Sequence, residues 1–141
     1  FDNVKENKLG KTSGQIVGGN LTLLHCLIGS KSSINTDNKI LFIEDLGEYH
    51  YHIDRMLVSL KRAGYFDNCK GLIVGDFTDL RKNTTPFGKS LKEIILDAVK
   101  EFDFPVLFDF PAGHEKINMP IILGRDITMD INSSKSSINF L

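Results

Sequence analysis

Two residues of this sequence, Glu44 and His114, are suited to acid–base chemistry and follow short apolar runs. Glu44 ends the run Ile40–Ile43, and His114 follows Gly113 soon after the run Pro105–Phe108. A carboxylate beside an imidazole forms the orienting half of a hydrolytic triad, because the carboxylate holds the ring tautomer that accepts a proton. A carboxylate at a strand end is also a common helix cap, so position alone leaves both interpretations open.

The nucleophile that would complete such a triad is missing from the sequence pattern. A nucleophilic serine or cysteine sits on a sharp turn between a strand and a helix. The serines here fall in polar loops or on a helix face, and Cys26 lies on an apolar helix face typical of a small core residue. The chain therefore carries at most two of the three groups.

Other polar and glycine motifs have weaker functional signals. Gly18 and Gly19 precede Asn20, a good N-cap, and could cradle an anion, although a packing turn is the more frequent use of such a pair. His50 and His52 are two residues apart, which does not place them on one helix face, and no third ligand is evident. We expect no metal and no cofactor.

Hydrophobic spacing predicts the elements that position these residues. Continuous apolar runs predict buried strands at 15–17, 40–43, 71–76 and 105–108. Helical spacing predicts three helices, at 21–28, from 53 to about 63, and at 91–101. Three further segments without helical spacing, 119–123, 126–131 and 136–140, predict an antiparallel set.

This alternation predicts an α/β fold with a small parallel sheet of three core strands, crossover helices and an antiparallel C-terminal layer. The carboxyl ends of parallel strands meet at one edge of the sheet. Glu44, Asp76 and His114 are therefore expected at that edge.

Length and composition limit the number of domains and exclude some classes of function. The 141 residues suit one domain, and a net charge of −1 argues against a nucleic-acid or anionic-lipid surface. No apolar run reaches the roughly 18 residues of a membrane span. Two cysteines are typical of a reducing compartment, and a first residue other than Met suggests a piece of a longer chain.

Six segments, in their order and spacing, resemble the C-terminal domain of the LD-carboxypeptidases, the serine peptidases called muramoyltetrapeptide carboxypeptidases. They run from about Ser13 to the end of the chain: Gly18–Leu21, Ile40–Asp45, Ile53–Leu57, Ile73–Phe77, Gly113–His114 and Pro120–Gly124. Each motif is ordinary alone, whereas six in order are specific.

The resemblance implies a cytoplasmic enzyme of murein recycling that releases the terminal D-alanine of a tetrapeptide through a Ser–Glu–His triad. Glu44 matches the triad carboxylate and His114 the base, while the serine belongs to an N-terminal domain absent here. Residues 1–13 would be the linker from that domain, and residues 14–141 a C-terminal domain of the swivelling β/β/α kind. Substrate-binding residues would be Gly18, Gly19, Asn20 and Gly113.

Further implications are a homodimer for the full-length enzyme and no activity for this chain alone. Two departures concern the substrate: Lys31–Lys39 is rich in serine and asparagine, and Ala112 stands where a phenylalanine is common. Two alternatives therefore stay open. One is the branch that hydrolyses acylated nucleotide–peptide antibiotics, and the other is a non-catalytic swivelling or interaction domain.

Overall fold

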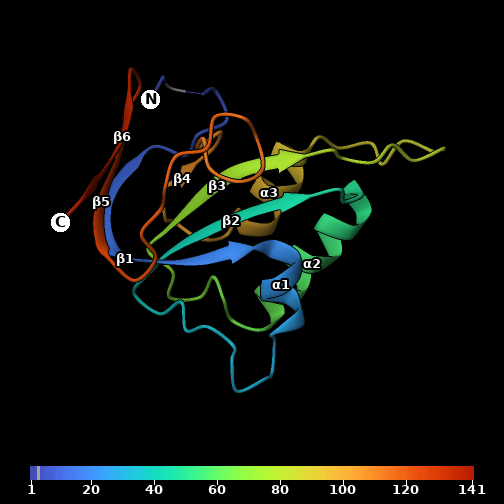
Figure 1. Cartoon of the computed structure of the whole chain (residues 1–141), viewed down its shortest axis with the longest axis horizontal. Helices are drawn as coiled ribbons and strands as arrows, with labels where there is room; N and C mark the ends of the chain where they lie inside the picture. The colour runs from blue at the N-terminus through green and yellow to red at the C-terminus, as the bar shows by residue number, and fades with distance from the viewer. Residues whose placement is uncertain (3) are drawn as a thin grey trace.

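A computed structural model describes residues 1–2 and 4–141 as an α/β fold built on one mixed, curled sheet (Figure 1). Its strands follow the order β4-β3-β2-β1-β5-β6. The elements in chain order are β1 (Gly10–Asn20), α1 (Leu21–Cys26), β2 (Ile40–Leu46), α2 (His50–Arg62), β3 (Gly71–Thr78), α3 (Leu91–Val99), β4 (Val106–Leu107), β5 (Asp126–Ile131) and β6 (Ser136–Phe140). The predicted fold class is confirmed.

The parallel half of the sheet consists of β1 to β4, and the antiparallel half of β1, β5 and β6. The two halves are continuous because β1 is eleven residues long and belongs to both. Its first part, Gly10–Gln15, pairs with β5, and its second part, Ile16–Asn20, pairs with β2. The predicted antiparallel layer is therefore an extension of the parallel sheet.

Two apolar cores lie on the two faces of this sheet. The first packs the helices against alternate strand residues such as Leu41 and Ile43. The second holds the intervening residues Ile40 and Phe42 together with inward-facing residues of β5. Because side chains alternate along a strand, a run apolar on both faces can serve both cores at once.

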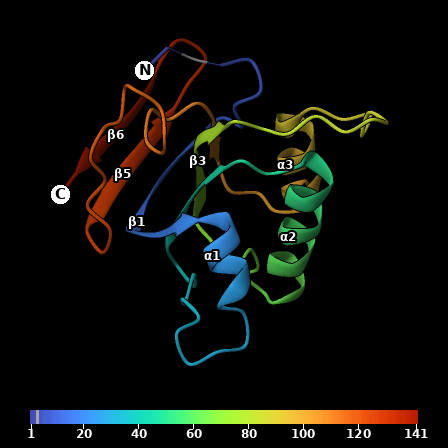
Figure 2. The same ribbon diagram turned by 45° about the vertical axis from the view of Figure 1, so that its right-hand side comes forward.

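The helices cover one face of the parallel half (Figure 2). In α2, Ile53, Met56, Leu57 and Leu60 are fully buried, as their helical spacing predicts. In α3, Ser90 and Glu93 form a reciprocal capping box. No helix in the described part of the chain is long and apolar enough to cross a membrane.

Three local predictions differ from the structure. Residues 119–123 form no strand, because this mostly exposed segment forms no ladder with a strand of the sheet. The strand β1 begins at Gly10, before the predicted start at residue 15, because β5 pairs with its first residues. The helix α1 ends at Cys26, before the predicted end at residue 28, and continues as a turn.

Candidate active site

The strand β2 carries Glu44 to the carboxyl edge of the sheet. Alternation along the strand sends Glu44 to the face of Phe42 and sends Asp45 to the helix-covered face. A register shift lies at this point: Ile43 pairs with Val74 and Asp45 with Phe77, so two residues of β3 oppose Glu44. The extra residue is in β3. A bulge of this kind bends the strand that carries it and redirects a side chain, and bulges are common beside active sites.

The loop after β4 carries His114, and the bulged part of β3 anchors this loop. The backbone N–H of Asp76 donates to the carbonyl of Ala112 at 2.9 Å. Gly113 has φ +151°, and a Cβ there would lie 2.9 Å from the Cβ of Asp76. Asn118 closes the loop by donating its amide to the Gly113 carbonyl at 3.0 Å. Only glycine fits this close approach between loop and strand.

Glu44 and His114, 70 residues apart in sequence, are in hydrogen-bond contact. The Nδ1 of His114 lies 2.8 Å from Oε2 of Glu44. The Glu44 side chain is 10% exposed, whereas the His114 side chain is 44% exposed. The carboxylate fixes the tautomer with hydrogen on Nδ1, which leaves Nε2 as a proton acceptor. Among the residues that the structure describes, no hydroxyl or thiol is hydrogen-bonded to His114.

A small hollow of about 260 Å³ adjoins this pair. Its walls are mostly apolar, and they combine the β2 face with the loop that follows His114. The lining includes Phe42, Ala112, Met119, Pro120 and Ile121. The site thus offers a buried carboxylate, an accessible imidazole and an apolar wall beside them.

Known proteins share this sequence pattern and fold. A sequence profile described as the LD-carboxypeptidase C-terminal domain matches residues 13–129. The chain belongs to the LD-carboxypeptidase family. A probable murein peptide carboxypeptidase of Bacillus subtilis is 36% identical over 121 residues, which cover 86% of this chain and 38% of that protein.

Solved structures show the same fold. The crystal structure of muramoyltetrapeptide carboxypeptidase from Oxalobacter formigenes superposes with a TM-score of 0.89 at 25% identity, covering 99% of this chain and 48% of that one. The microcin C7 self-immunity protein MccF in complex with glutamyl sulfamoyl guanosine gives a TM-score of 0.80 at 26% identity, covering 94% and 39%. The chain therefore spans less than half the length of these relatives.

In this LD-carboxypeptidase domain the segment Gly18–Asn20 serves the fold. A Cβ on Gly18 would lie 1.9 Å from the carbonyl oxygen of Phe42, so β1 and β2 meet closely there. Asn20 caps α1 by accepting from Leu23 N at 3.1 Å and donates to Oδ1 of Asp45 at 2.9 Å. Gly19 has no atom within 4 Å of an added Cβ. A substrate-binding role for these residues stays a prediction, as it does for Gly113.

The neighbour of Glu44, Asp45, has a structural environment. It is 2% exposed and accepts hydrogen bonds from Asn20, from the N–H and hydroxyl of Thr22, and from Leu46 N. These bonds hold the start of α1 against the end of β2. Adjacent carboxylates in the sequence thus face different surroundings on the two sides of one strand.

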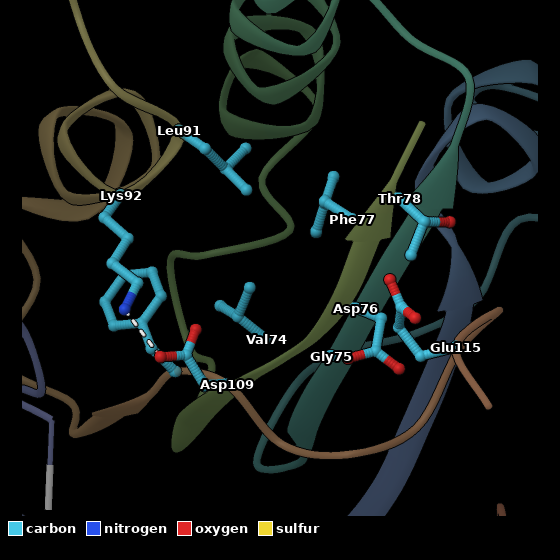
Figure 3. Close-up of a pocket in the computed structure, with 10 residues that line it drawn as sticks. Val74, Gly75, Asp76, Phe77, Thr78, Leu91, Lys92, Asp109 and Glu115 are labelled. Carbon is cyan, nitrogen blue, oxygen red and sulfur yellow. Dashed lines mark hydrogen bonds and ion pairs between the residues drawn. The ribbon is translucent and has the colours of Figure 1, made fainter. Parts of the chain in front are cut away.

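Two further carboxylates, Asp76 and Glu115, line a separate cavity of about 280 Å³ (Figure 3). Burial raises the pKa of Asp76, and the negative charge of Glu115 raises it further. The Oδ2 atom of Asp76 is buried without a hydrogen-bond partner. Across the cavity Lys92 is already paired with Asp109 at 2.6 Å. The position of Asp76 at the end of a predicted strand identified it as a candidate site residue from the sequence, whereas no sequence pattern identified Glu115.

The described residues contain no group of three His, Cys, Asp or Glu side chains that could hold a metal ion. Of the two histidines near the start of α2, His52 is hydrogen-bonded to Glu48. The edge of the sheet therefore brings together Glu44 and His114, with Asp76 and Glu115 beside them.

Proposed function

We propose that this chain supplies Glu44 and His114 to the Ser–Glu–His triad of a serine LD-carboxypeptidase that releases the terminal D-alanine of murein tetrapeptides. The observation that carries this proposal is the 2.8 Å contact between His114 Nδ1 and Glu44 Oε2, with the imidazole accessible. In this proposal the serine lies in an N-terminal domain outside the chain. This is consistent with the relatives, because this chain matches less than half of the length of each.

The proposed chemistry gives each group one task. The serine hydroxyl loses its proton to Nε2 of His114 as its oxygen attacks the carbonyl carbon before the terminal D-alanine. Glu44 stabilises the imidazolium that forms. When the carbon–nitrogen bond breaks, His114 gives the proton to the leaving amine. Water then attacks the acyl-enzyme by the same route, and serine regains its proton.

The surroundings of the pair favour a short peptide as substrate. The apolar hollow of about 260 Å³ beside His114 is suited to a small side chain such as the methyl group of alanine. Open space over Gly19 allows a substrate backbone to approach β1, and Gly113 would present its backbone beside the reacting group. We infer from the family resemblance a cytoplasmic, homodimeric enzyme.

A second candidate is hydrolysis of acylated nucleotide–peptide antibiotics. It is favoured by the likeness to MccF, which was solved with glutamyl sulfamoyl guanosine. The same Glu44 and His114 would serve both reactions, because both break a bond at an acyl carbon. Only the leaving group and its pocket differ.

Release of D-alanine from an L,D-linked tetrapeptide tests the first function. We expect the complete protein to release it, the 141-residue chain alone to be inactive, and added N-terminal domain to restore release. The His114→Ala variant of the complete protein should lose roughly three or more orders of magnitude in turnover. Release by the chain alone would refute the half-site proposal. An inactive complete protein that cleaves an aminoacyl sulfamoyl nucleotide would favour the second function, and inactivity on both would favour a non-catalytic domain.

A further inference from the structure

A groove of about 640 Å³ opens away from the Glu44–His114 pair, between the loop after β3 and the start of α2. It shares no lining residue with the hollow beside His114. The loop, residues 79–90, extends from the body of the molecule in Figure 1. The groove is thus a separate feature of the same edge of the sheet.

Cations line this groove without any carboxylate among them. His50, Arg81, Lys82 and Lys89 are the ionisable lining residues. Lys89 is paired at 2.5 Å with Asp97, which lies outside the lining. Within the described part of the chain, neither Arg81 nor Lys82 has a carboxylate within 4 Å. At least two full positive charges therefore face the groove uncompensated, in a chain whose net charge is −1.

The start of α2 brings uncapped backbone N–H groups to the groove. His50, the first residue of α2, lines the groove. The N-cap Tyr49 makes no side-chain cap and the first turn carries no acidic residue, while the nearby Glu48 carboxylate is taken up by His52 at 2.5 Å and lies outside the lining of the groove. The start of α3 differs, because Ser90 and Glu93 satisfy each other in a capping box. An uncapped helix N-terminus carries a partial positive charge that favours an anion.

A stack of aromatic and cationic side chains outside the groove holds Arg81, which lines it. The guanidinium of Arg81 lies 5.6 Å from the centre of the Tyr49 ring, which stacks on Tyr51 at 5.2 Å. Arg55 covers the next ring at 4.7 Å. Cation–π contacts of this kind restrain Arg81 while leaving its N–H groups available to a ligand.

The remaining wall is apolar. Leu80, Pro86 and Phe87 line the groove, and Phe87 is 38% exposed. An apolar wall beside uncompensated cations suits a ligand with a hydrophobic body and one charged end. A bare inorganic ion would use only part of this surface.

We propose that this groove binds an organic anion, a carboxylate or a phosphate carried on an apolar or aromatic body. Arg81, Lys82 and the start of α2 receive the charged group, and Leu80 and Phe87 contact the body. The proposal is independent of the function of Glu44 and His114, since no residue is shared between the two sites.

Amide chemical shifts of the isotope-labelled chain, titrated with four probes, test the proposal. Phenyl phosphate and benzoate represent the two anion sources, benzyl alcohol is the neutral analogue, and inorganic phosphate lacks the apolar body. We expect saturable shifts confined to residues 79–90 and the start of α2. At least one of phenyl phosphate and benzoate should bind more tightly than both benzyl alcohol and inorganic phosphate. The more tightly bound of these two anions shows whether the charged group of the ligand is a phosphate or a carboxylate.

Charge removal supplies the matched control. Lys82→Gln should weaken binding about threefold, and Arg81→Gln with Lys82→Gln about tenfold, as expected for loss of partly exposed charges. Lys31→Gln removes an exposed lysine of another loop and should change nothing. If Arg81→Gln disturbs the stack on Tyr49, Lys82→Gln decides alone. Unchanged binding in Lys82→Gln, equal binding of benzyl alcohol, or shifts spread over other surfaces would overturn the proposal.

Discussion

Glu44 and Asp45 show how one step along a strand changes the role of a carboxylate. Glu44 faces His114 across the sheet edge, whereas Asp45 faces the start of α1 and accepts four hydrogen bonds. The two side chains have equal charge and similar burial. Their partners alone separate a proposed catalytic role from a structural one.

Matched amide substitutions in the complete enzyme should separate these roles. Glu44→Gln should lower turnover by roughly two to four orders of magnitude while unfolding stays unchanged, because the imidazolium loses its anionic partner. Asp45→Asn should instead lower the free energy of unfolding by about 1–3 kcal/mol, because an amide nitrogen then faces backbone and side-chain donors. D-Alanine release and urea unfolding measure the two effects. The assignment of Glu44 fails if Glu44→Gln retains full turnover.

Asp76 gives a prediction on pH dependence. Burial and Glu115 raise the pKa of Asp76 above its ordinary value, so the folded chain binds its proton at a higher pH than the unfolded chain does. Between these two pKa values the folded state holds more protons than the unfolded state. The contribution of Asp76 to the free energy of unfolding therefore increases as the pH falls and is lost as the pH rises.

Asp76→Asn should therefore stabilise the chain at neutral pH and reduce the gain in stability on mild acidification. Thermal unfolding from neutral to acidic pH measures both changes, with Asp2→Asn on the exposed N-terminal segment as the control. A variant that follows the parent curve at every pH would contradict this account of Asp76.

At the scale of elements, the bulge in β3 sets the distance between β2 and the His114 loop. Gly75 and Asp76 together oppose Glu44, and the Asp76 backbone holds the loop at Ala112. A Cβ on Gly75 would lie 2.3 Å from the Ala112 carbonyl oxygen. The strand can approach the loop this closely only because this position has no side chain.

Two glycines of β3 form a matched pair for testing this role. Gly75→Ala should destabilise the fold by about 1–3 kcal/mol and weaken the Glu44–His114 contact, because a rigid backbone must move. Gly71→Ala should cost less, since its nearest contact is the flexible end of Met129 at 2.7 Å. Urea unfolding and the His114 imidazole signals in NMR report the two effects. Equal losses in both variants would contradict the role assigned to Gly75.

At the scale of the whole molecule, apolar side chains are exposed beside the proposed site. Ile117 is 75% exposed, and Met119, Ile122 and Leu123 of the same segment are also exposed. This segment continues from the loop that carries His114. Exposed apolar residues gathered in one segment are typical of an interaction surface.

We expect this segment to cause concentration-dependent self-association of the 141-residue chain. Replacing Ile117 and Ile122 by aspartate should shift the chain toward monomer and, in the two-part enzyme, weaken docking of the N-terminal domain. Sedimentation velocity measures the first effect, with Leu23→Asp on the exposed face of α1 as the control. A parent chain that stays monomeric at high concentration would contradict this expectation.

The sequence by itself determined the family, the fold class and most elements. The apolar runs at 40–43 and 71–74 had to be buried on both faces, and the spacing in α2 allowed only one inward face. Glu44 and His114 were identifiable because each follows a strand whose carboxyl end lies at the same edge. These are local patterns, which the free energy of burial enforces wherever they occur.

Only the tertiary structure decided how these pieces meet. The pairing of β1 with β5 joined the two halves into one sheet, and the lack of a pairing partner left 119–123 without strand structure. The bulge opposite Glu44, the partners of Asp45 and the charge of Glu115 beside Asp76 depend on contacts between residues far apart in the chain. The groove at Arg81 likewise depends on a distant contact, because the loop 79–90 supplies its charges and apolar wall and encloses the groove only together with His50 at the start of α2.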